Sequence, residues 1–350
     1  MMNSQSIIAF GEPLQSVIAE TPVPTGHQIL LKVTYCGVCH SDVHLHDGHF
    51  DMGNGNKLDI GAGMQLPFTL GHEIEGTVVA CGPDATIAKE GDARVVFPWI
   101  GCGDCPTCKR GDEHLCSRPQ QLGVNVPGGF ADYVLVPHEK YLLDYTGITK
   151  GLAATYMCSG LTAFSALKKI GSPAPDDTIL IIGLGGVGMM GLQFAKALFN
   201  CRVLATDIDT MKLAEAEKAG ADATFNAADA NAYKQIKRAT NGGVYAAIDF
   251  VGSEPSFGLA RGSLRKGGRA VIVGLFGGSF SMSIPLLPLQ VHTLQGSFVG
   301  SLDEATEMLA LVQAGAVAPI PIAERPIEAA TDTMDDLRNG NIVGRVVLRP

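Results

Sequence analysis

Charged residues are scarce in this sequence, at 17% of the chain, and aromatic residues are scarcer still, at 6%. So little charge is not typical of coiled coils or disordered chains, and the 43 glycines indicate a globular protein rich in loops. The chain has 350 residues with 46% hydrophobic content, which is enough for two domains with proper cores. It has no internal repeat and no low-complexity segment.

Positive charge is also in short supply, because 26 lysines and arginines face 35 acidic residues and give a net charge of −9. A diffuse acidic balance argues against nucleic acid, and against an anionic membrane surface, as the main partner. The N-terminus lacks a basic segment and has only a short apolar run, so we expect no signal peptide and a cytoplasmic location. The nine cysteines should then be reduced thiols or metal ligands rather than disulfides.

One uncharged run of 18 residues, Thr178–Ala195, is long enough to cross a membrane. Five of its residues are glycines gathered near its middle, and this spacing fits a strand, a glycine turn and a helix better than a spanning helix. We therefore favour a soluble protein.

The two halves of the chain differ in their patterns. The first 150 or so residues contain short β-like runs separated by frequent turn signals, such as Ile29–Thr34, Ile74–Ala80 and Arg94–Pro98. From about residue 176, strand-like and helix-like runs alternate, which predicts a parallel sheet covered by helices. These runs are Ile179–Ile182, Val187–Phe199, Arg202–Thr206, Thr210–Ala219, Tyr245–Phe250 and Arg269–Val273. The last 50 residues break this rhythm, with a helical stretch at Leu302–Ala314 and a terminal strand-like run.

A glycine-rich turn follows the first strand of the alternating region. Its residues form the pattern G-x-G-x-x-G: Gly183, Leu184, Gly185, Gly186, Val187 and Gly188. Such a pattern is weak alone, but between a buried strand and a helix it permits a pyrophosphate to approach the helix N-terminus. Asp207 ends the next strand, 19 residues beyond Gly188, and would bind the adenosine ribose hydroxyls and repel a 2′-phosphate, unless it only caps the next turn. The unit favours NAD over NADP.

A compact cysteine cluster carries a second signal. Cys102, Cys105, Cys108 and Cys116 follow the spacing C-x2-C-x2-C-x7-C. Four thiolates this close satisfy one tetrahedral zinc ion, and closed sites of this kind are structural. An iron–sulfur cluster and a set of redox thiols are the competing interpretations. We expect zinc, which would pin a loop and take no part in chemistry.

The run Cys36-Gly-Val-Cys39-His40 is ambiguous by itself. It fits the attachment site of a c-type haem, a redox pair or half of a zinc site. Cys39, His72 and Cys158 are ligand types scattered along the chain, and each has an ordinary alternative as a buried core residue.

Together the motifs carry a resemblance that covers essentially the whole chain. The segments Cys39–His44 and Gly71–Glu73, the four-cysteine cluster, Cys158 and the glycine turn with Asp207 resemble the zinc-dependent alcohol dehydrogenases of the medium-chain dehydrogenase/reductase superfamily. The resemblance implies an α/β protein with a β-rich GroES-like catalytic domain and a doubly wound Rossmann cofactor domain. We place the catalytic domain at 1–159 and 297–350, with the zinc lobe at about 100–117, and the Rossmann domain at 160–296.

The resemblance also implies roles at the active site. A catalytic zinc would be held by Cys39, His72 and Cys158 with one position open, and the four-cysteine site would make two zinc ions per subunit. Glu73 would lie behind the metal and could exchange with its outer ligand. The remaining roles would fall to Asp42, which orients the zinc-binding histidine, to Ser41, which contacts the substrate oxygen, and to His44, which ends a proton relay.

Further positions match cofactor contacts in that family. His40 and Arg345 would contact the pyrophosphate, Lys212 the adenosine ribose, and Val251 the adenine side. Cys36, Cys81 and Cys201 receive no role. Subunits of the family assemble through the cofactor domain, so we expect a homo-oligomer, with a tetramer favoured over a dimer, and the apolar strand-like run 279–288 as a candidate interface or, alternatively, a plain core strand.

The sequence departs from the family pattern in one place. Cys39 and His72 are 33 residues apart, about a dozen more than in the best-known members, and the extra material is residues 49–65. This glycine-rich segment has no regular period, and we expect a lid-like loop near the substrate cleft. Trp99 and Tyr156 would line that cleft or serve only in packing.

The expected function is interconversion of an alcohol and its aldehyde or ketone with NAD. A carbonyl reductase or a polyol or aldehyde-adduct dehydrogenase of the same superfamily is the alternative. A non-catalytic protein that binds zinc and nucleotide is a more distant one. The sequence leaves the substrate open.

Overall fold

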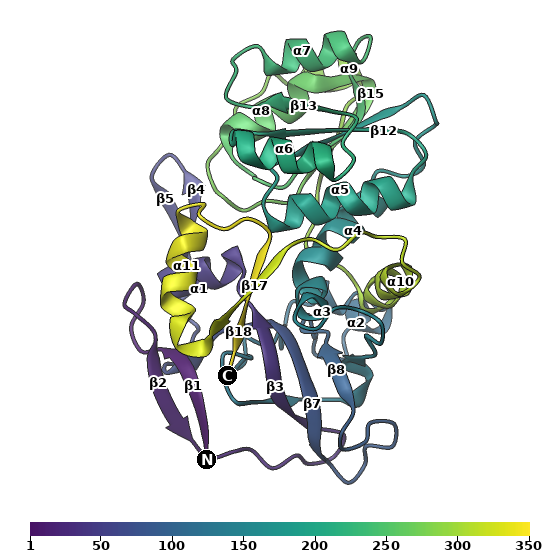
Figure 1. Cartoon of the computed structure of the whole chain (residues 1–350). Coiled ribbons are helices and arrows are strands. Elements are labelled where there is room, and N and C mark those ends of the chain that lie inside the picture. The colour runs from purple at the N-terminus through teal and green to yellow at the C-terminus, as the bar shows by residue number, and fades with distance from the viewer.

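The chain folds into two parts, which Figure 1 shows one above the other. A computed structural model describes residues 1–350. The lower part combines both ends of the sequence, and the upper part is built from the middle of the sequence, coloured teal to green (Figure 1). The expected α/β class, with one β-rich part and one part built on a parallel sheet, is confirmed.

The lower part is organised around a mixed sheet of seven strands, in the order β10-β8-β7-β3-β18-β17, with β9 paired to β3. These strands are β3 (Ile29–Gly37), β7 (Glu73–Cys81), β8 (Ala93–Val96), β9 (Tyr133–Val136), β10 (Leu142–Leu143), β17 (Ile322–Pro326) and β18 (Arg345–Arg349). A small sheet, β2-β1-β6, consists of β1 (Met2–Ile7), β2 (Gln15–Ala19) and β6 (Phe68–Thr69). Because β18 pairs with β3, both ends of the sequence meet here.

Helices surround this sheet and lead into the upper part. They are α1 (His40–Asp47), α2 (Pro106–Lys109), α3 (Leu152–Thr155), α4 (Leu161–Lys168), α10 (Leu302–Gln313), α11 (Ala330–Arg338), the 3-10 turns η1 (Glu113–Leu115), η2 (Glu139–Tyr141) and η4 (Ile327–Ala329), and the π-helical η3 (Tyr156–Gly160). Helices α3, η3 and α4 follow one another without a break. Phe164 of α4 packs edge-on against Phe194 of the upper part, with ring centroids 5.6 Å apart, so this continuous helix connects the two parts.

The upper part is a parallel sheet of six strands in the order β13-β12-β11-β14-β15-β16. Its elements are β11 (Thr178–Ile182), α5 (Gly186–Leu198), β12 (Arg202–Asp207), α6 (Thr210–Lys218), β13 (Ala223–Asn226), α7 (Ala232–Ala239), β14 (Val244–Asp249), α8 (Glu254–Ser263), β15 (Leu264–Ile272), α9 (Leu286–Gln290) and β16 (Thr293–Gly296). Strand order reverses between β11 and β14, and ligands of such sheets bind at the carboxyl ends of the strands at that point. The uncharged run 178–195 is thus a strand, a turn and a helix, as expected.

Residues 49–65 correct one expectation, because part of this segment is regular. It contains a hairpin of β4 (His49–Gly53) and β5 (Asn56–Asp59), joined by Asn54 and Gly55 at φ 54° and 76°. An Asn-Gly pair favours such tight turns because both residues tolerate positive φ, so the sequence did carry a hairpin signal. The hairpin points toward the upper part (Figure 1). At its tip, Asn54 Nδ2 donates to Ser279 Oγ at 2.9 Å.

The run 279–288 corrects another expectation, because it forms no strand. It is an exposed irregular segment that enters α9 at Leu286. Pro285 and Pro288 have no N–H to donate, so neither can take part fully in a sheet ladder. On this side the edge strand of the upper sheet is β16, which follows α9, and β13 forms the other edge.

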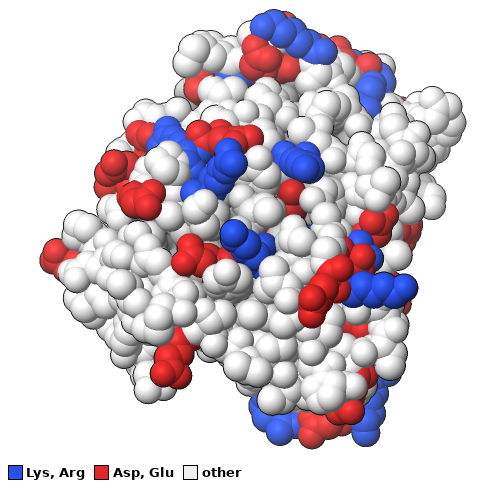
Figure 2. All heavy atoms as spheres, turned by 60° about the horizontal axis from the view of Figure 1, so that its bottom comes forward, with Lys and Arg blue, Asp and Glu red and all other residues white.

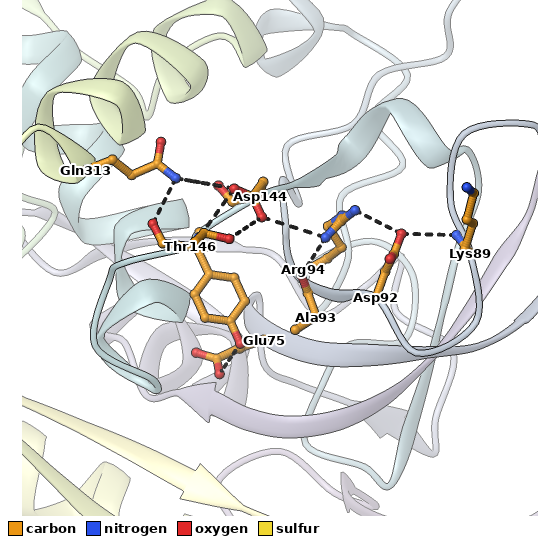
Figure 3. A network of polar contacts seen from close by, with 9 residues as sticks. Glu75, Lys89, Asp92, Ala93, Arg94, Asp144, Thr146 and Gln313 are labelled. Atoms are coloured by element: carbon orange, nitrogen blue, oxygen red, sulfur yellow. Dashed lines mark hydrogen bonds and ion pairs between the residues drawn. The ribbon is translucent and has the colours of Figure 1, made fainter.

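A polar network ties the end of α10 to the lower part (Figure 3). Gln313 Nε2 donates to the carbonyl oxygen of Thr146 at 3.2 Å and to that of Asp144 at 3.4 Å. The Asp144 carboxylate lies 3.7 Å from Arg94, which pairs in turn with Asp92 at 2.8 Å. Since Arg94 belongs to β8, the chain is fixed against the central sheet as it returns from the upper part.

The molecular surface carries mixed charge. On the face that Figure 2 shows, acidic and basic side chains are interspersed among uncharged ones, with no large area of a single sign. None of the helices combines the length and the apolar character needed to cross a membrane.

Candidate active site

Helix α1 fixes the first cluster residue at its N-terminus. Cys39 is the N-cap, and its backbone N–H donates to Asp42 Oδ2 at 2.8 Å. Asp42 is fully buried, and its other oxygen, Oδ1, accepts from the backbone N–H of Gly71 and lies 3.3 Å from His72 Nδ1. One carboxylate therefore orients both Cys39 and His72, although they are far apart in sequence.

His72 points a free ring nitrogen into the cluster. Its side chain is completely buried, and Nε2 has no hydrogen-bond partner in the protein. A buried polar atom without a partner is costly, so Nε2 requires a ligand that the protein itself does not supply. The ring of Trp99 covers this histidine at a centroid distance of 5.3 Å, and the Trp99 indole N–H donates to the carbonyl oxygen of Met157 at 2.8 Å.

Cys158 comes from the π-helical turn between α3 and α4, where the wider winding displaces residues from ordinary helical positions. Its sulfur lies 3.9 Å from that of Cys39. Hydrogen bonding from the Cys158 thiol, together with His72, lowers the pKa of the Cys39 thiol, and this favours the thiolate. Ligand atoms of Cys39, His72, Glu73 and Cys158 all lie within 4.8 Å of one another, so the predicted trio converges.

These residues fit a zinc ion well. Two thiol sulfurs and one imidazole nitrogen are the ligand types of open zinc sites, and the unpartnered Nε2 of His72 is aimed at the same space. Glu73, the fourth member, is completely buried beside them, and burial raises its pKa to about 7 against the opposing charge of Arg345.

The four-cysteine lobe has the geometry of a closed site. Sulfur–sulfur distances are 4.0 Å for Cys102 to Cys108, 3.4 Å for Cys105 to Cys108 and 3.8 Å for Cys105 to Cys116. Tetrahedral zinc with Zn–S bonds of about 2.3 Å requires sulfurs roughly 3.8 Å apart. The backbone N–H of Cys108 donates to Cys105 and, with the Cys108 thiol, lowers the pKa of Cys105 to about 6.

One acidic residue, Glu113, holds the lobe to η2, the 3-10 turn that leads into strand β10 of the central sheet. Glu113 accepts from Tyr141 at 2.6 Å, from Lys140 at 2.7 Å and from the backbone N–H of Gly101 at 3.2 Å. No motif in the sequence indicated Glu113. Only its position inside the cysteine cluster, between Cys108 and Cys116, could have indicated it.

The glycine turn lies at the carboxyl end of β11. Gly183 has φ 84°, and a β-carbon there would be 2.5 Å from the side chain of Val251. A β-carbon on Gly188 would be 1.7 Å from the carbonyl oxygen of Gly183, whereas one on Gly185 would meet no atom within 4 Å. The carboxylate of Asp207 accepts from the backbone N–H of Leu184 at 2.6 Å, which places Asp207 beside the turn.

The other predicted residues lie around these two centres. The Ser41 hydroxyl is 3.9 Å from the Cys39 sulfur, and the His44 ring is 4.8 Å from that of Phe50 in the hairpin. His40 is exposed at the first turn of α1. Lys212 lies on α6, the helix that follows Asp207.

Several residues have contacts that the sequence did not indicate. Arg345 is buried and pairs with the Glu73 carboxylate, while its side chain also packs where a β-carbon of Gly186 would be. Ser159, beside Cys158, donates to Glu73 at 2.9 Å. His46 is buried and donates from Nε2 to the Glu12 carbonyl oxygen at 2.7 Å.

The two residues proposed for the cleft wall differ in their surroundings. Trp99 lies against His72, and the edge of its ring faces Phe298 at 5.8 Å, so it borders the cluster. Tyr156 packs against Phe194 of α5 and is buried between helices, which makes it a packing residue. Cys36, although only three residues from Cys39, packs against Gly71 and Gly129 and does not join the cluster.

Comparisons with known proteins agree with this geometry. The alcohol dehydrogenase GroES-like domain matches residues 25–146, and the zinc-binding dehydrogenase domain matches residues 186–314. An NAD-dependent alcohol dehydrogenase of Sulfurisphaera tokodaii is 38% identical, with 100% of each chain covered. The chain belongs to the zinc-binding alcohol dehydrogenases. An alcohol dehydrogenase of Geobacillus stearothermophilus is 34% identical over 99% of each chain.

Solved structures extend the match to the whole fold of this alcohol dehydrogenase. The crystal structure of the enzyme from Aeropyrum pernix superposes with a TM-score of 0.89 at 27% identity, covering 99% of this chain and 100% of that one. The resemblance seen in the sequence is thereby confirmed, as are the GroES-like β domain and the Rossmann-like sheet. The protein is an NAD-dependent zinc alcohol dehydrogenase, and NAD and zinc are its cofactors.

Proposed function

We propose that the alcohol is oxidised at the cluster of Cys39, His72 and Cys158, and that these three side chains hold a catalytic zinc ion. The convergence of the three ligand atoms, with His72 Nε2 unpartnered, is the observation that carries the proposal. When bound, zinc acts there as a Lewis acid toward the oxygen of the alcohol or carbonyl. A second zinc ion in the four-cysteine lobe makes two per chain.

The surrounding side chains position the substrate and move its proton. Ser41, next to Cys39, accepts the hydroxyl proton of the alcohol and passes it on toward His44. Burial, together with the charge of His40, lowers the pKa of His44 and keeps this ring neutral and able to take up a proton. Asp42 holds His72 in place through Nδ1.

The cofactor lies across the upper sheet at its point of reversal, over the 183–188 turn. NAD supplies the acceptor for the hydride that leaves the alcohol carbon. Asp207 binds the adenosine ribose with help from Lys212, and Val251 lies on the adenine side. The pyrophosphate contacts Arg345 and His40. We propose domain limits of 1–159 with 297–350, and of 160–296; the position of each large sheet within one of these ranges supports the proposal.

The aromatic residues beside the cluster favour an apolar alcohol or ketone. Trp99 borders His72, Phe298 lies against Trp99, and Phe50 of the hairpin lies against His44. These rings offer few hydrogen bonds to a sugar or polyol, which needs many. We therefore favour primary or secondary alcohols with apolar chains. Reduction of the matching ketones follows as the reverse reaction.

We also propose that the enzyme is a homo-oligomer, with a tetramer favoured over a dimer. Large apolar side chains are exposed on one stretch of the upper part, within α9 and on either side of it: Phe276 (70%), Ile284 (80%), Leu289 (64%) and Val291 (60%). The neighbouring edge strand β16 has unpaired backbone groups. Light scattering coupled to size exclusion tests this, and a monomer overturns it.

The test of the catalytic site compares two cysteines of one motif. Initial rates of NADH formation are measured with short, long, aromatic, primary and secondary alcohols, with NAD beside NADP, and zinc is counted by mass spectrometry. We expect Cys39→Ala to lose about one zinc per chain and nearly all turnover, while Cys36→Ala keeps both. Full activity in Cys39→Ala overturns the proposed site.

A further inference from the structure

The catalytic cluster contains one ligand group more than an open zinc site needs. Cys39, His72, Glu73 and Cys158 all present a ligand atom within the same 4.8 Å. Four protein ligands close a tetrahedral zinc site, whereas catalysis requires three and a free position for the substrate. Something must therefore keep one of the four away from the metal.

Glu73 is the member whose ligand atoms are already engaged. Its Oε1 accepts a hydrogen bond from the Ser159 hydroxyl at 2.9 Å, and its Oε2 pairs with the guanidinium of Arg345. Gly37 completes the cradle, because a β-carbon there would lie 2.0 Å from Oε2. Both Glu73 and Ser159 are completely buried, so no water competes for these bonds.

We propose that Ser159 is a positioning residue that latches Glu73 away from the catalytic metal and so keeps a coordination position open for the substrate. The proposal rests on the catalytic zinc site proposed above. Ser159 directly follows Cys158 in the π-helical turn, so the same turn that supplies a metal ligand also restrains the competing one.

Ser159 is the part of the cradle that can be tested by itself. Arg345 also packs against Gly186 of the cofactor turn, and its removal would disturb the cofactor site as well. A hydrogen bond to a carboxylate in a dry site is strong, so its loss shifts the position of Glu73 between cradle and metal by about tenfold or more. Alanine at 159 removes this bond and adds no bulk.

The experiment uses the holoenzyme with cobalt(II) in place of zinc, because cobalt reports its ligands in the visible spectrum. Imidazole is titrated as a probe of the open position. In Ser159→Ala we expect the freed carboxylate to compete, so that imidazole binds at least about fivefold more weakly. KM for the alcohol should rise by a similar factor, whereas KM for NAD should stay unchanged.

The matched control is Ser165→Ala. Ser165 is also fully buried, and its hydroxyl bonds to Lys169 at 2.7 Å rather than to Glu73. This variant loses a buried hydroxyl of the same helix region, and it should bind imidazole as the parent does. An equal loss of affinity in both variants would show a general packing effect and overturn the latch.

Three further outcomes decide the matter. Imidazole affinity within twofold of the parent in a folded Ser159→Ala overturns the latch alone. A parent that takes up cobalt only at the four-cysteine lobe overturns the catalytic site and the latch with it. A third measurement uses the parent cobalt enzyme alone and records the relaxation rate of solvent protons. We expect faster relaxation, because an exchangeable water occupies the open position on the metal. No faster relaxation would mean that Glu73 already occupies this position, and would overturn the latch.

Discussion

Replacing Gly188 or Gly185 of the glycine turn by alanine should affect the protein in two different ways: one substitution should lower stability and the other should weaken cofactor binding. A β-carbon on Gly188 would lie 1.7 Å from the carbonyl oxygen of Gly183 and 2.8 Å from its carbonyl carbon. Both atoms belong to the backbone, so no side chain can rotate aside. Gly185 has φ −67°, which alanine adopts freely, and its β-carbon would meet no atom within 4 Å.

The cost at Gly188 follows from this overlap. Real β-carbons essentially never come within 3.0 Å of such an atom, so the start of α5 must move by at least about 1.3 Å from β11. Overpacking in a tight core costs about 1–3 kcal/mol, and a clash with rigid backbone belongs at the upper end. About 3 kcal/mol lowers Tm by roughly 6–12 °C for a domain of this size.

Alanine at 185 should leave stability unchanged and damage cofactor binding. Fewer unfolded conformations are open to alanine than to glycine, so Tm should be equal or slightly raised. In the proposed cofactor site, a pyrophosphate approaches the N-terminus of α5 through the open space beside Gly185. A methyl group there should weaken NAD binding by about tenfold or more, since one displaced phosphate loses at least one charge-assisted hydrogen bond.

Calorimetry of the zinc-loaded, cofactor-free variants at one scan rate gives the melting temperatures, and NADH fluorescence titration gives the affinities. Gly188→Ala should melt lower and Gly185→Ala should melt with the parent. A Gly188→Ala protein within 2 °C of the parent would refute the steric reasoning. So would a Gly185→Ala protein that loses as much stability as Gly188→Ala.

Three other substitutions are informative. Asp207→Ser should lower kcat/KM with NAD by about 10–100-fold, because the charged hydrogen bonds from the Asp207 carboxylate to the two ribose hydroxyls are lost. It should raise kcat/KM with NADP, because the carboxylate no longer repels the 2′-phosphate. An unchanged cofactor preference in initial rates contradicts this. Burial opposes ionisation of Glu139, but the backbone N–H groups of residues 86–88 outweigh it and lower its pKa to about 2. The pKa of Glu139 is therefore lower in the folded protein than in the unfolded chain. The ionised carboxylate stabilises the fold above a pH of about 4.3, and this stabilisation is lost as the pH falls toward 2. Glu139→Gln should therefore melt a few degrees below the parent at pH 7, with a gap that narrows below about pH 4.3; a gap independent of pH speaks against this account. Phe298→Ala removes a half-exposed ring that faces Trp99, so bulky alcohols should gain about fivefold in kcat/KM over ethanol with little change in Tm, and an unaltered ranking excludes Phe298 from the substrate site.

Patterns that act over short distances were readable in the sequence. The strand, turn and helix around Gly183 follow from a buried apolar run, a glycine that must adopt positive φ and an amphipathic continuation. The four-cysteine lobe is equally local, since its ligands lie within 15 residues. Asn54-Gly55 was also a local signal for a hairpin. The other glycines nearby made the whole segment resemble an irregular loop, so this signal was missed.

Contacts between distant segments could not be read in the same way. The run 279–288 has the composition of a strand, yet its prolines and its position outside the upper sheet leave it irregular. Cys39, His72 and Cys158 were joined beforehand only through family resemblance. Their convergence depends on α1, β7 and a π-helical turn meeting at one point, which no spacing reveals.

The sequence by itself determined the local elements, the glycine turn and the four-cysteine lobe, because each is specified by residues that are near neighbours along the chain. The tertiary structure alone decided which side chains restrain one another. Pairing of β18 with β3 brings Arg345 to Glu73 across 272 residues, and the turn after α3 brings Ser159 to the same carboxylate across 86. Burial then excludes water from these bonds, so that a residue's role depends on which groups surround it rather than on its sequence neighbours.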